Sequence, residues 1–240
     1  MTIRLGVPSK GRLQDKTIDW FAVRGIFLER GDSEREYAGR VTGVDGVELV
    51  LLAAGEIPRE LATGRLHVGV TGTDLVREKI PMWRSLVSET ARLGFGRADL
   101  VVAVPRTWID VTTLDDLDAA AAQFRRNHGF RLRIATKYHN LVRTFLRDHG
   151  VADYQLVDSQ GATEGTVKNL AAEAIADITS TGDTLGANHL RALTDGLVHA
   201  SQAALFLSKT AVRVSGEDRA LAVLFGKLGL PKPRFARPPR

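Results

Sequence analysis

The segment DITSTGDTLGAN, residues 177–188, places seven side chains able to hydrogen-bond and two glycines directly after a short apolar run. A strand ending at Ile178 and a helix opening near Leu185 would leave a run of backbone N–H groups without intrahelical partners, where the helix dipole adds partial positive charge. An anion fits there. Gly182 can adopt positive φ, and Asp183 belongs to the same loop. Phosphate oxygens could accept from the hydroxyls of Thr179, Ser180, Thr181 and Thr184.

The competing interpretation of this loop is structural, because Thr and Ser also cap helices and turn chains. Asp177 favours the binding interpretation, since a carboxylate beside an anion site would repel the ligand unless it accepts from sugar hydroxyls. Glu164, in GATEGT, offers a second carboxylate thirteen positions earlier. A phosphate cradle with two hydroxyl-accepting acids predicts a pocket for ribose 5-phosphate. The loop lacks the lysine of a Walker A motif, so an ordinary P-loop ATPase is not indicated.

The elements that must position these residues alternate short apolar strands with helical segments, which favours an α/β fold. The expected strands are Ile3–Val7, Val47–Leu52, His67–Val70, Leu100–Val104, Leu132–Ala135, Tyr154–Val157 and Ile175–Ile178. The expected helices are Leu13–Arg24, Ile57–Thr63, Leu141–His149, Thr166–Ala174 and Ala220–Lys227. In the Thr166–Ala174 helix, the i, i+3, i+4, i+7 spacing of its apolar residues predicts one face that packs on a sheet.

Two similar strand-loop-helix units indicate two lobes. HVGVTGTDLV and IADITSTGDTL both run from an apolar strand through Thr and Gly to a leucine, although chance would also explain so short a match. The expected crossings between lobes are the segment GFGRAD, residues 94–99, and the segment 190–197, where glycine and charge separate apolar runs. We therefore expect a first lobe over 1–96, a second lobe over 97–190, and a return to the first lobe with a tail over 191–240.

Composition excludes several classes of protein. The chain has 240 residues, 44% apolar and 25% charged, which is typical of globular proteins. It has no cysteine, so thiolate nucleophiles, disulfides and cysteine-bound metals are out. The net charge of +5 is not gathered into a basic stripe with aromatics, which argues against nucleic acid. No apolar run or N-terminal segment predicts a membrane span or a signal peptide, so we expect a cytoplasmic protein.

Five segments in order resemble the catalytic chain of ATP phosphoribosyltransferase: VPSKGRL, GVTGTDLV, RIATKYHNLVRTFL, GATEGT and ADITSTGDTLGANHLR. Each would be weak alone, but the set is specific. The resemblance implies transfer of the phosphoribosyl group of phosphoribosyl pyrophosphate to N1 of the adenine of ATP, with release of pyrophosphate, as the first step of histidine biosynthesis. It also implies a two-lobed α/β fold like the type II periplasmic binding proteins, with the site in a cleft between lobes.

The same resemblance implies the site residues. Glu164, Asp177 and the loop 179–184 would bind phosphoribosyl pyrophosphate, with the two acids on the ribose hydroxyls. Lys10, Gly11 and Arg12 would meet the pyrophosphate or the ATP phosphates, unless they are merely solvated residues of a turn. Gly72, Thr73 and Asp74 would lie near ATP, although Thr73 could equally cap a helix. The catalytic set is then Lys10, Arg12, Glu164 and Asp177, with Mg²⁺ as cofactor and no protein ligand for it assigned.

Two positions depart from the family pattern. Ala53 and Ala54 stand where an arginine is expected near GEIPREL, and Arg35 or Arg59 would have to supply the charge to ATP. His139 replaces the proline of a Y-P-N-L motif, and a histidine at a helix start is more often a capping or surface residue than a catalyst.

The resemblance further implies partners. The chain stops where longer members begin a ferredoxin-like regulatory domain, so it resembles the short form. Such chains work in a hetero-octamer with a regulatory subunit similar to histidyl-tRNA synthetase, and the chain alone is expected to be a dimer. Two alternatives remain open at this point: a phosphoribosyltransferase for free bases, and a cytoplasmic two-lobed sensor that binds a phosphorylated ligand without reaction.

Overall fold

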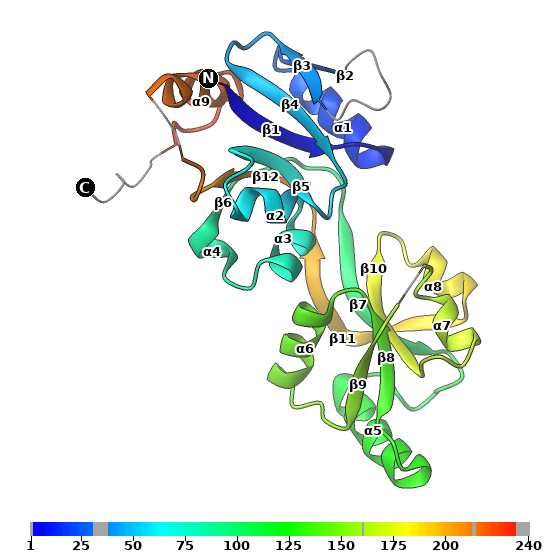
Figure 1. Ribbon diagram of the computed structural model, residues 1–240. Coiled ribbons are helices and arrows are strands. Elements are labelled where there is room, and N and C mark those ends of the chain that lie inside the picture. Colours follow the sequence, from blue (N-terminus) through cyan, green and yellow to red (C-terminus); the bar gives the residue numbers. More distant parts are fainter. Residues whose placement is uncertain (1, 31–37, 160, 213–214, 234–240) are drawn as a thin grey trace. The chain divides into compact units, whose positions relative to one another are not determined.

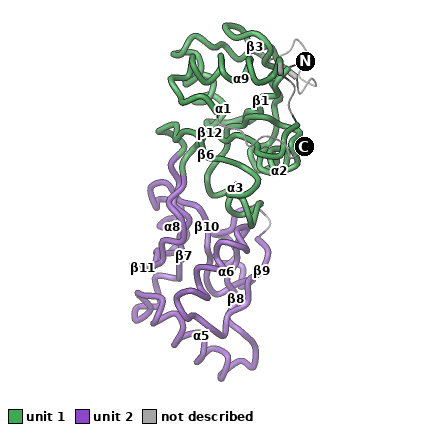
Figure 2. The backbone as a smooth tube through the Cα atoms, turned by 90° about the vertical axis from the view of Figure 1, so that its left-hand side faces the viewer, with its two compact units in different colours: residues 1–96, 202–240 green, residues 97–201 purple. Residues whose placement is uncertain are grey.

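The chain folds into two compact α/β units. The computed structural model describes residues 2–30, 38–159, 161–212 and 215–233. One unit comprises residues 1–96 and 202–240, and the other comprises residues 97–201, as coloured in Figure 2. The first boundary lies inside the GFGRAD segment. The return to the first unit follows Ser201 and not residue 191, because strand β11 (Leu190–Ser201) pairs antiparallel with β7 (Ala98–Pro105) of the second unit.

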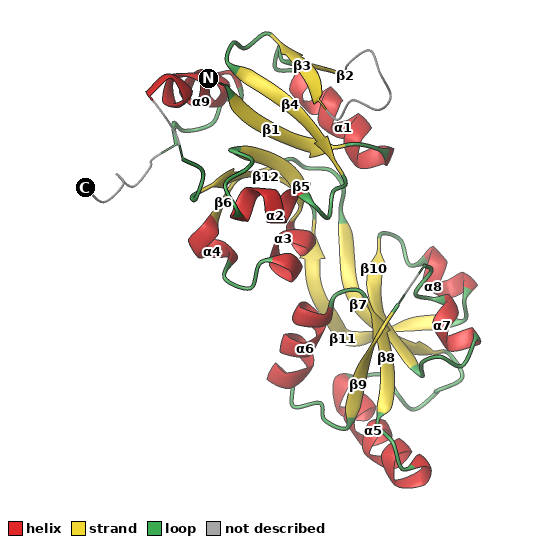
Figure 3. Ribbon diagram, in the orientation of Figure 1, coloured by secondary structure: helices red, strands yellow, loops and turns green. Residues whose placement is uncertain are grey.

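The first unit is built on a seven-stranded sheet in the order β2-β3-β4-β1-β5-β12-β6. Its strands are β1 (Ile3–Pro8), β2 (Phe27–Arg30), β3 (Ala38–Thr42), β4 (Val47–Leu52), β5 (Val68–Gly72), β6 (Val87–Arg92) and β12 (Ala203–Ser208). Its helices are α1 (Gly11–Ala22), α2 (Ile57–Ala62), α3 (Thr73–Lys79), α4 (Trp83–Leu86) and α9 (Ser215–Lys227). Figure 3 shows these helices against the strands.

Three neighbouring strands of this sheet run parallel. β1 pairs with β4 on one side, Ile3 opposite Val47, and with β5 on the other, Leu5 opposite Val68. The carboxyl ends of parallel strands meet at one edge of a sheet, so the segments after Pro8, Leu52 and Gly72 lie at the same edge. Ligands of open α/β sheets commonly bind outside this edge.

Apolar residues cover both faces of the first sheet. On one face, Phe21 of α1 and Leu221, Leu224 and Phe225 of α9 pack with strand residues such as Leu5. On the other, residues of α2 and α3 (Ile57, Leu61 and Val76) pack with Phe206 of β12. The side chains named here are at most 1% exposed, and the burial of each one stabilises the fold by about 2 kcal/mol. The sheet is therefore a rigid support for the loops at its edge.

The second unit has a five-stranded sheet in the order β11-β7-β10-β8-β9. Its further strands are β8 (Leu132–Thr136), β9 (Tyr154–Asp158) and β10 (Ala174–Thr179), and its helices are α5 (Leu114–His128), α6 (His139–Asp148), α7 (Gly165–Lys168) and α8 (Asp183–Ala187). β10, β8 and β9 are parallel neighbours, so the segments that follow them share one edge. In Figure 1, α6 lies on one side of this sheet and α7 and α8 on the other.

One predicted helix is wrong. The helix expected over Thr166–Ala174 ends at Lys168, because Leu170 has a φ of 57° and is 81% exposed. Left-handed backbone of this kind stops a helix. Ala174 instead begins β10, whose register places Ala174 opposite Ile134 of β8.

Among the described residues, no helix is long and apolar enough to cross a membrane.

Candidate functional site

The loop after β10 is held in shape by hydrogen bonds of its own side chains. Gly182 adopts a φ of 82°, and its backbone N–H donates to Oγ1 of Thr179 at 2.9 Å. Thr181 donates through Oγ1 to Oδ2 of Asp183 at 2.7 Å, and Ser180 donates through Oγ to the carbonyl oxygen of Arg97 at 3.1 Å. The loop is thus a preformed turn, tied to the start of the neighbouring strand.

Helix α8 makes a smaller contribution than the sequence predicts. It has five residues, Asp183–Ala187, beginning two residues before the predicted opening at Leu185, and its N-cap Gly182 has no side chain to accept a hydrogen bond. A dipole summed over little more than one turn is weak. The donors available to an anion are therefore the hydroxyls and N–H groups of the loop itself. The hydroxyl residues Thr181 and Thr184 are exposed, as such donors must be, and so is Asp183, whose carboxylate accepts hydrogen bonds.

The two predicted acids lie at the same edge of the second sheet. Asp177 is the fourth residue of β10, opposite Val101 of β7, and its Oδ1 accepts from the N–H of Ile178 at 2.8 Å. Glu164 precedes α7 in the segment that follows β9. Both are half-buried. Partial burial leaves each carboxylate able to accept hydrogen bonds from a ligand while limiting its motion.

A cavity of about 400 Å³ adjoins the loop. Its lining comprises Thr179–Gly182, Leu185, three residues of β11 and Asp99, Val101 and Arg106. Arg106 donates through Nε to the carbonyl oxygen of Leu190 at 3.2 Å, and its Nη2 would lie 3.5 Å from a Cβ added at Gly186 of α8. Arg106 and Asp99 were not predicted as site residues from the sequence, since neither belongs to a polar run. Asp99 lies on β7 opposite Thr179 of β10, and Arg106 directly follows β7, where its N–H donates to the carbonyl oxygen of His189 after α8.

Arg191, which also lines this cavity, has a structural task. Its Nη2 donates to the carbonyl oxygens of Trp108 and Val111, each at 2.7 Å, and to that of Ile109 at 3.2 Å. These contacts hold the turn between β7 and α5.

The residues predicted for ATP lie at the carboxyl edge of the first sheet. Lys10 and Arg12 follow β1 and are exposed, and Gly11 between them has a φ of 76°. Gly72 ends the neighbouring strand β5 and is the N-cap of α3. The structure therefore places the basic turn and the Gly72 turn after adjacent parallel strands.

Thr73 and Asp74 are less accessible than the prediction requires. Thr73 is 3% exposed and its N–H donates to the carbonyl oxygen of Gln202 at 3.1 Å, while Asp74 is 6% exposed. The alternative of Thr73 as a helix cap is also not seen, since α3 begins at Thr73 and its cap residue is Gly72.

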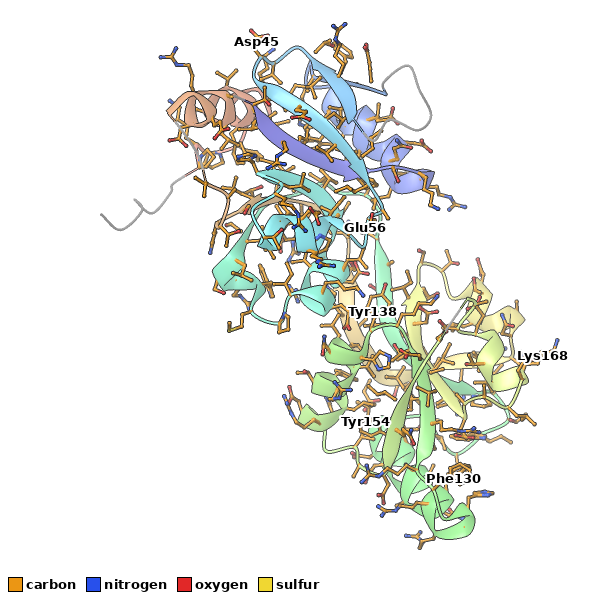
Figure 4. All side chains as sticks on the ribbon, viewed as in Figure 1. Asp45, Glu56, Phe130, Tyr138, Tyr154 and Lys168 are labelled. Carbon is orange, nitrogen blue, oxygen red and sulfur yellow. The ribbon has the colours of Figure 1, made fainter. Side chains whose placement is uncertain are left out.

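A carboxylate accepts a hydrogen bond from the backbone at Ala53, where an arginine is expected. Oε2 of Glu56 accepts from the N–H of Ala53 at 3.0 Å, closing the turn after β4. Figure 4 labels Glu56 on the first unit. Arg59 lies in α2 and is exposed. Arg35, the other residue proposed to supply the charge, is outside the described residues.

Within the part of the chain that the structure describes, no group of three or more His, Asp or Glu side chains could hold a metal ion. Mg²⁺ does not require such a group, since it commonly binds through one or two carboxylates and the phosphates of a substrate.

Fold and loop together define the class: a two-unit α/β protein of the periplasmic-binding-protein type with a hydroxyl-rich turn. In solved structures, a chain of the ATP phosphoribosyl transferase (HisG:HisZ) complex from Thermotoga maritima aligns with a TM-score of 0.70 at 19% identity, over 95% of this chain and 96% of that one. A histidine kinase sensor domain with similarity to periplasmic binding proteins aligns with a TM-score of 0.51 at 14% identity, over 95% of this chain and 89% of that one. These two likenesses show the fold alone.

Sequence comparison identifies the family. Residues 53–228 match the family model HisG, ATP phosphoribosyltransferase. An ATP phosphoribosyltransferase of Cereibacter sphaeroides is 67% identical over 97% of this chain and 98% of its own length. One of Chelativorans sp. is 51% identical over 87% of this chain and 91% of its own length. The chain belongs to the ATP phosphoribosyltransferase family, and its reaction is phosphoribosyl transfer in the first step of histidine biosynthesis. The sensor alternative is not favoured.

Proposed function

We propose that the second unit binds phosphoribosyl pyrophosphate through the turn 179–184, with Asp177 and Glu164 accepting from the ribose hydroxyls. One observation carries this assignment. The hydroxyl-rich turn, with left-handed backbone at Gly182, and the two half-buried carboxylates lie at one edge of the same sheet. Hydroxyls and N–H groups suit a phosphate, whereas carboxylates suit neutral sugar hydroxyls. The arrangement therefore matches the two chemically different parts of ribose 5-phosphate.

Binding requires an exchange of hydrogen bonds within the loop. The hydroxyl of Thr181 donates a hydrogen bond to Asp183 and that of Ser180 donates one to the carbonyl oxygen of Arg97, so neither hydroxyl donates to a phosphate while these bonds last. Thr179 accepts from Gly182 and keeps its own proton to donate. We propose that Thr179, Thr184 and the backbone N–H groups are the first phosphate donors, with Thr181 turning from Asp183 as the phosphate arrives.

The basic turn of the first unit is assigned to the anionic groups of the second substrate and the leaving group. Lys10 and Arg12 are exposed cations after β1, and charge-assisted contacts to phosphate contribute roughly 1.5 to 3 kcal/mol each. Mg²⁺ is proposed to arrive with the pyrophosphate and to be held mainly by substrate oxygens, where it would neutralise the charge on the leaving group. The assignments of Gly11, Gly72, Thr73 and Asp74 to ATP remain predictions, and burial limits the last two to indirect support.

The proposed reaction needs positioning more than proton transfer. The lone pair of adenine N1 forms the new bond to the anomeric carbon, while the bond to the pyrophosphate oxygen breaks and its electron pair leaves with pyrophosphate. N1 carries no proton that must be removed first. Protein groups contribute by fixing the ribose against the acceptor and by stabilising the leaving charge.

The Thermotoga maritima structure named above is a complex of two kinds of chain. On that basis we propose that this chain works with a separate regulatory subunit similar to histidyl-tRNA synthetase, in a hetero-octamer, and forms a dimer alone. We also propose that it acts in the cytoplasm, where a biosynthetic enzyme meets ATP.

The substitution Asp177→Asn tests the ribose assignment. It keeps the size of the side chain and removes its charge, so the fold should persist while turnover falls by about 10- to 100-fold, the scale for losing a charged hydrogen bond to substrate. Pyrophosphate release and product absorbance measure turnover with ATP, phosphoribosyl pyrophosphate and Mg²⁺, with the regulatory subunit added if the chain alone is silent. Asp110→Asn, at an exposed turn of the same unit, is the matched control. Equal activity of the two variants would refute the assignment.

A further inference from the structure

The turn that follows β8 holds the segment that carries Glu164. β8 and β9 are parallel neighbours in register, with Thr136 opposite Asp158. From these ends one chain segment runs through Lys137 and Tyr138 into α6, and the other runs toward Glu164. Figure 4 labels Tyr138 at the start of α6. We name residues 136–139 the α6 turn, and residues 158, 159 and 161–164 the Glu164 loop.

Three contacts join the α6 turn to the Glu164 loop. Nε2 of His139 lies 2.7 Å from Oδ1 of Asp158. Nζ of Lys137 donates to the carbonyl oxygen of Gly161 at 2.5 Å. The N–H of Ser159 donates to the carbonyl oxygen of Thr136 at 3.3 Å. The first two come from side chains, so residue type at 137 and 139 decides whether they form.

A buried pair fixes the inside of the same loop. Oγ of Ser159 donates to Oγ1 of Thr163 at 2.8 Å, and the two residues are 6% and 0% exposed. Thr166 of α7 donates through Oγ1 to the carbonyl oxygen of Thr163 at 2.6 Å. Glu164 directly follows Thr163. Its backbone is therefore set by contacts that begin at the α6 turn and pass through Ser159 and Thr163.

His139 takes part in no capping of α6. The helix has Tyr138 as N-cap with no side-chain capping hydrogen bond, and the imidazole is directed to Asp158. The histidine side chain is 28% exposed and that of Asp158 is 85% exposed. An accessible pair of this kind is worth little to stability, on the order of 0.2 to 1 kcal/mol. The significance of the His139–Asp158 pair is that it orients the Glu164 loop.

We propose that His139 is a positioning residue, which acts through Asp158 to hold Glu164 where it meets the ribose hydroxyls of phosphoribosyl pyrophosphate. Lys137 acts in the same way through Gly161. The inference rests on the assignment of Glu164 made above. Neither residue touches the substrate in this proposal. Their removal loosens the Glu164 loop but keeps the carboxylate of Glu164, so we expect weaker binding of phosphoribosyl pyrophosphate and little change in the chemical step.

The test compares steady-state constants of the complete enzyme. His139→Ala should raise KM for phosphoribosyl pyrophosphate by about two- to fivefold, the fold-change that corresponds to an exposed ion pair, and leave kcat and KM for ATP near their original values. His139→Gln, whose amide reaches about as far as Nε2, should restore most of the loss. His149→Ala is the matched control, since this histidine caps the other end of α6, where its Nδ1 lies 2.8 Å from the carbonyl oxygen of Phe145.

A double-substitution cycle separates positioning from a general loss of stability. If His139 acts through Asp158, then Asp158→Ala should raise the same KM, and the double variant should be no worse than either single one. Should His139→Ala fail to fold, Asp158→Ala carries the same expectation. An unchanged KM in His139→Ala, effects that multiply in the double variant, or an equal effect of His149→Ala would each overturn the proposal.

Glu164→Gln distinguishes a failure of the Glu164 assignment from a failure of the positioning role of His139. If this variant leaves KM for phosphoribosyl pyrophosphate unchanged, the assignment of Glu164 fails and the positioning role falls with it. If it raises KM while His139→Ala does not, the assignment stands and only the positioning role is wrong.

Discussion

Substituting Gly182 by alanine should weaken binding of phosphoribosyl pyrophosphate through backbone strain alone. An added Cβ at this position meets no heavy atom within 4 Å, so there is no steric clash. The backbone has a φ of 82° and a ψ of −4°, where an L side chain costs roughly 1 to 2 kcal/mol. Gly182→Ala therefore penalises the turn without altering any contact.

Gly129 supplies a nearly ideal control. It ends α5 with a φ of 79° and a ψ of −1°, and an added Cβ there also meets nothing within 4 Å. Gly129→Ala and Gly182→Ala should each lower the free energy of unfolding by up to about 1 to 2 kcal/mol. Only Gly182→Ala should change binding. If the turn relaxes in the free enzyme and must re-form around the phosphate, KM for phosphoribosyl pyrophosphate rises by about 5- to 30-fold.

The assay measures KM for phosphoribosyl pyrophosphate and for ATP by pyrophosphate release, together with denaturant unfolding of both variants. KM for ATP should stay constant, because the strain lies in the second unit. The reasoning is refuted if both variants lose similar stability and Gly182→Ala keeps its KM within about twofold of the control, since strain at Gly182 would then be uncoupled from phosphate binding.

Two further predictions concern stability. The N–H and hydroxyl groups of Thr112 and Thr113 hold the pKa of Asp116 down to about 2, so this carboxylate stabilises the start of α5 above pH about 3.8 and the contribution disappears as pH falls toward 2. The difference in unfolding temperature between wild type and Asp116→Asn should shrink over that interval, and a constant difference would contradict the assignment. Gly43→Ala should destabilise by roughly 2 to 5 kcal/mol, because φ is 89° and the new Cβ would lie 2.1 Å from the carbonyl oxygen of Gly25. Denaturant unfolding checks this, and a loss below that of Gly129→Ala would contradict it.

Strands rich in apolar residues were predictable because burial of at least one face leaves apolar residues at alternate positions of the sequence. Val47–Leu52 is a strand with the predicted bounds, and Leu132–Ala135 is extended by one residue. The edge strand β2 and its neighbour β3 were missed because, among their described side chains, Leu28 alone is a buried apolar one, which leaves no clear run.

The longest helix of the second unit was missed for a different reason. Helix α5 contains LDDLDAAAAQFRRNH, in which few large apolar residues mark a face. The signal that could have found it is local: Thr113 and Asp116 form a capping box, with the N–H of Asp116 donating to Oγ1 of Thr113 at 3.2 Å. The helix expected over Thr166–Ala174 is the opposite error, since it was predicted but is not formed. Its apolar residues follow the 3.6-residue period of a helix, but that period does not reveal the left-handed backbone at Leu170.

The candidate site was predictable where its residues are consecutive and unpredictable where they come from different strands. The loop 179–184 and its two acids stand out in the sequence because polar residues gather there. Asp99 lies on β7 and reaches the loop through the antiparallel pairing of β7 with β10, where it is opposite Thr179. Arg106 directly follows β7, and its N–H donates to the carbonyl oxygen of His189 after α8. The contact between His139 and Asp158 likewise depends on the register of β8 and β9, which no local pattern encodes.

The hydroxyls of loop 179–184 look equivalent in the sequence, but in the structure they have different hydrogen-bond partners. Ser180 ties the loop to the carbonyl of Arg97, at the boundary between the units, while Thr181 is paired with Asp183 inside the turn. A preformed loop spares a ligand the entropy of ordering it, but two of its donors are then engaged elsewhere. The carboxylate of Asp183 is the better partner to be displaced, since an exposed acid regains its hydrogen bonds from water, whereas the backbone carbonyl of Arg97 fixes the position of the whole turn. Ser180 therefore supports the loop, and under the proposed function Thr181 is the hydroxyl that we expect an incoming phosphate to recruit.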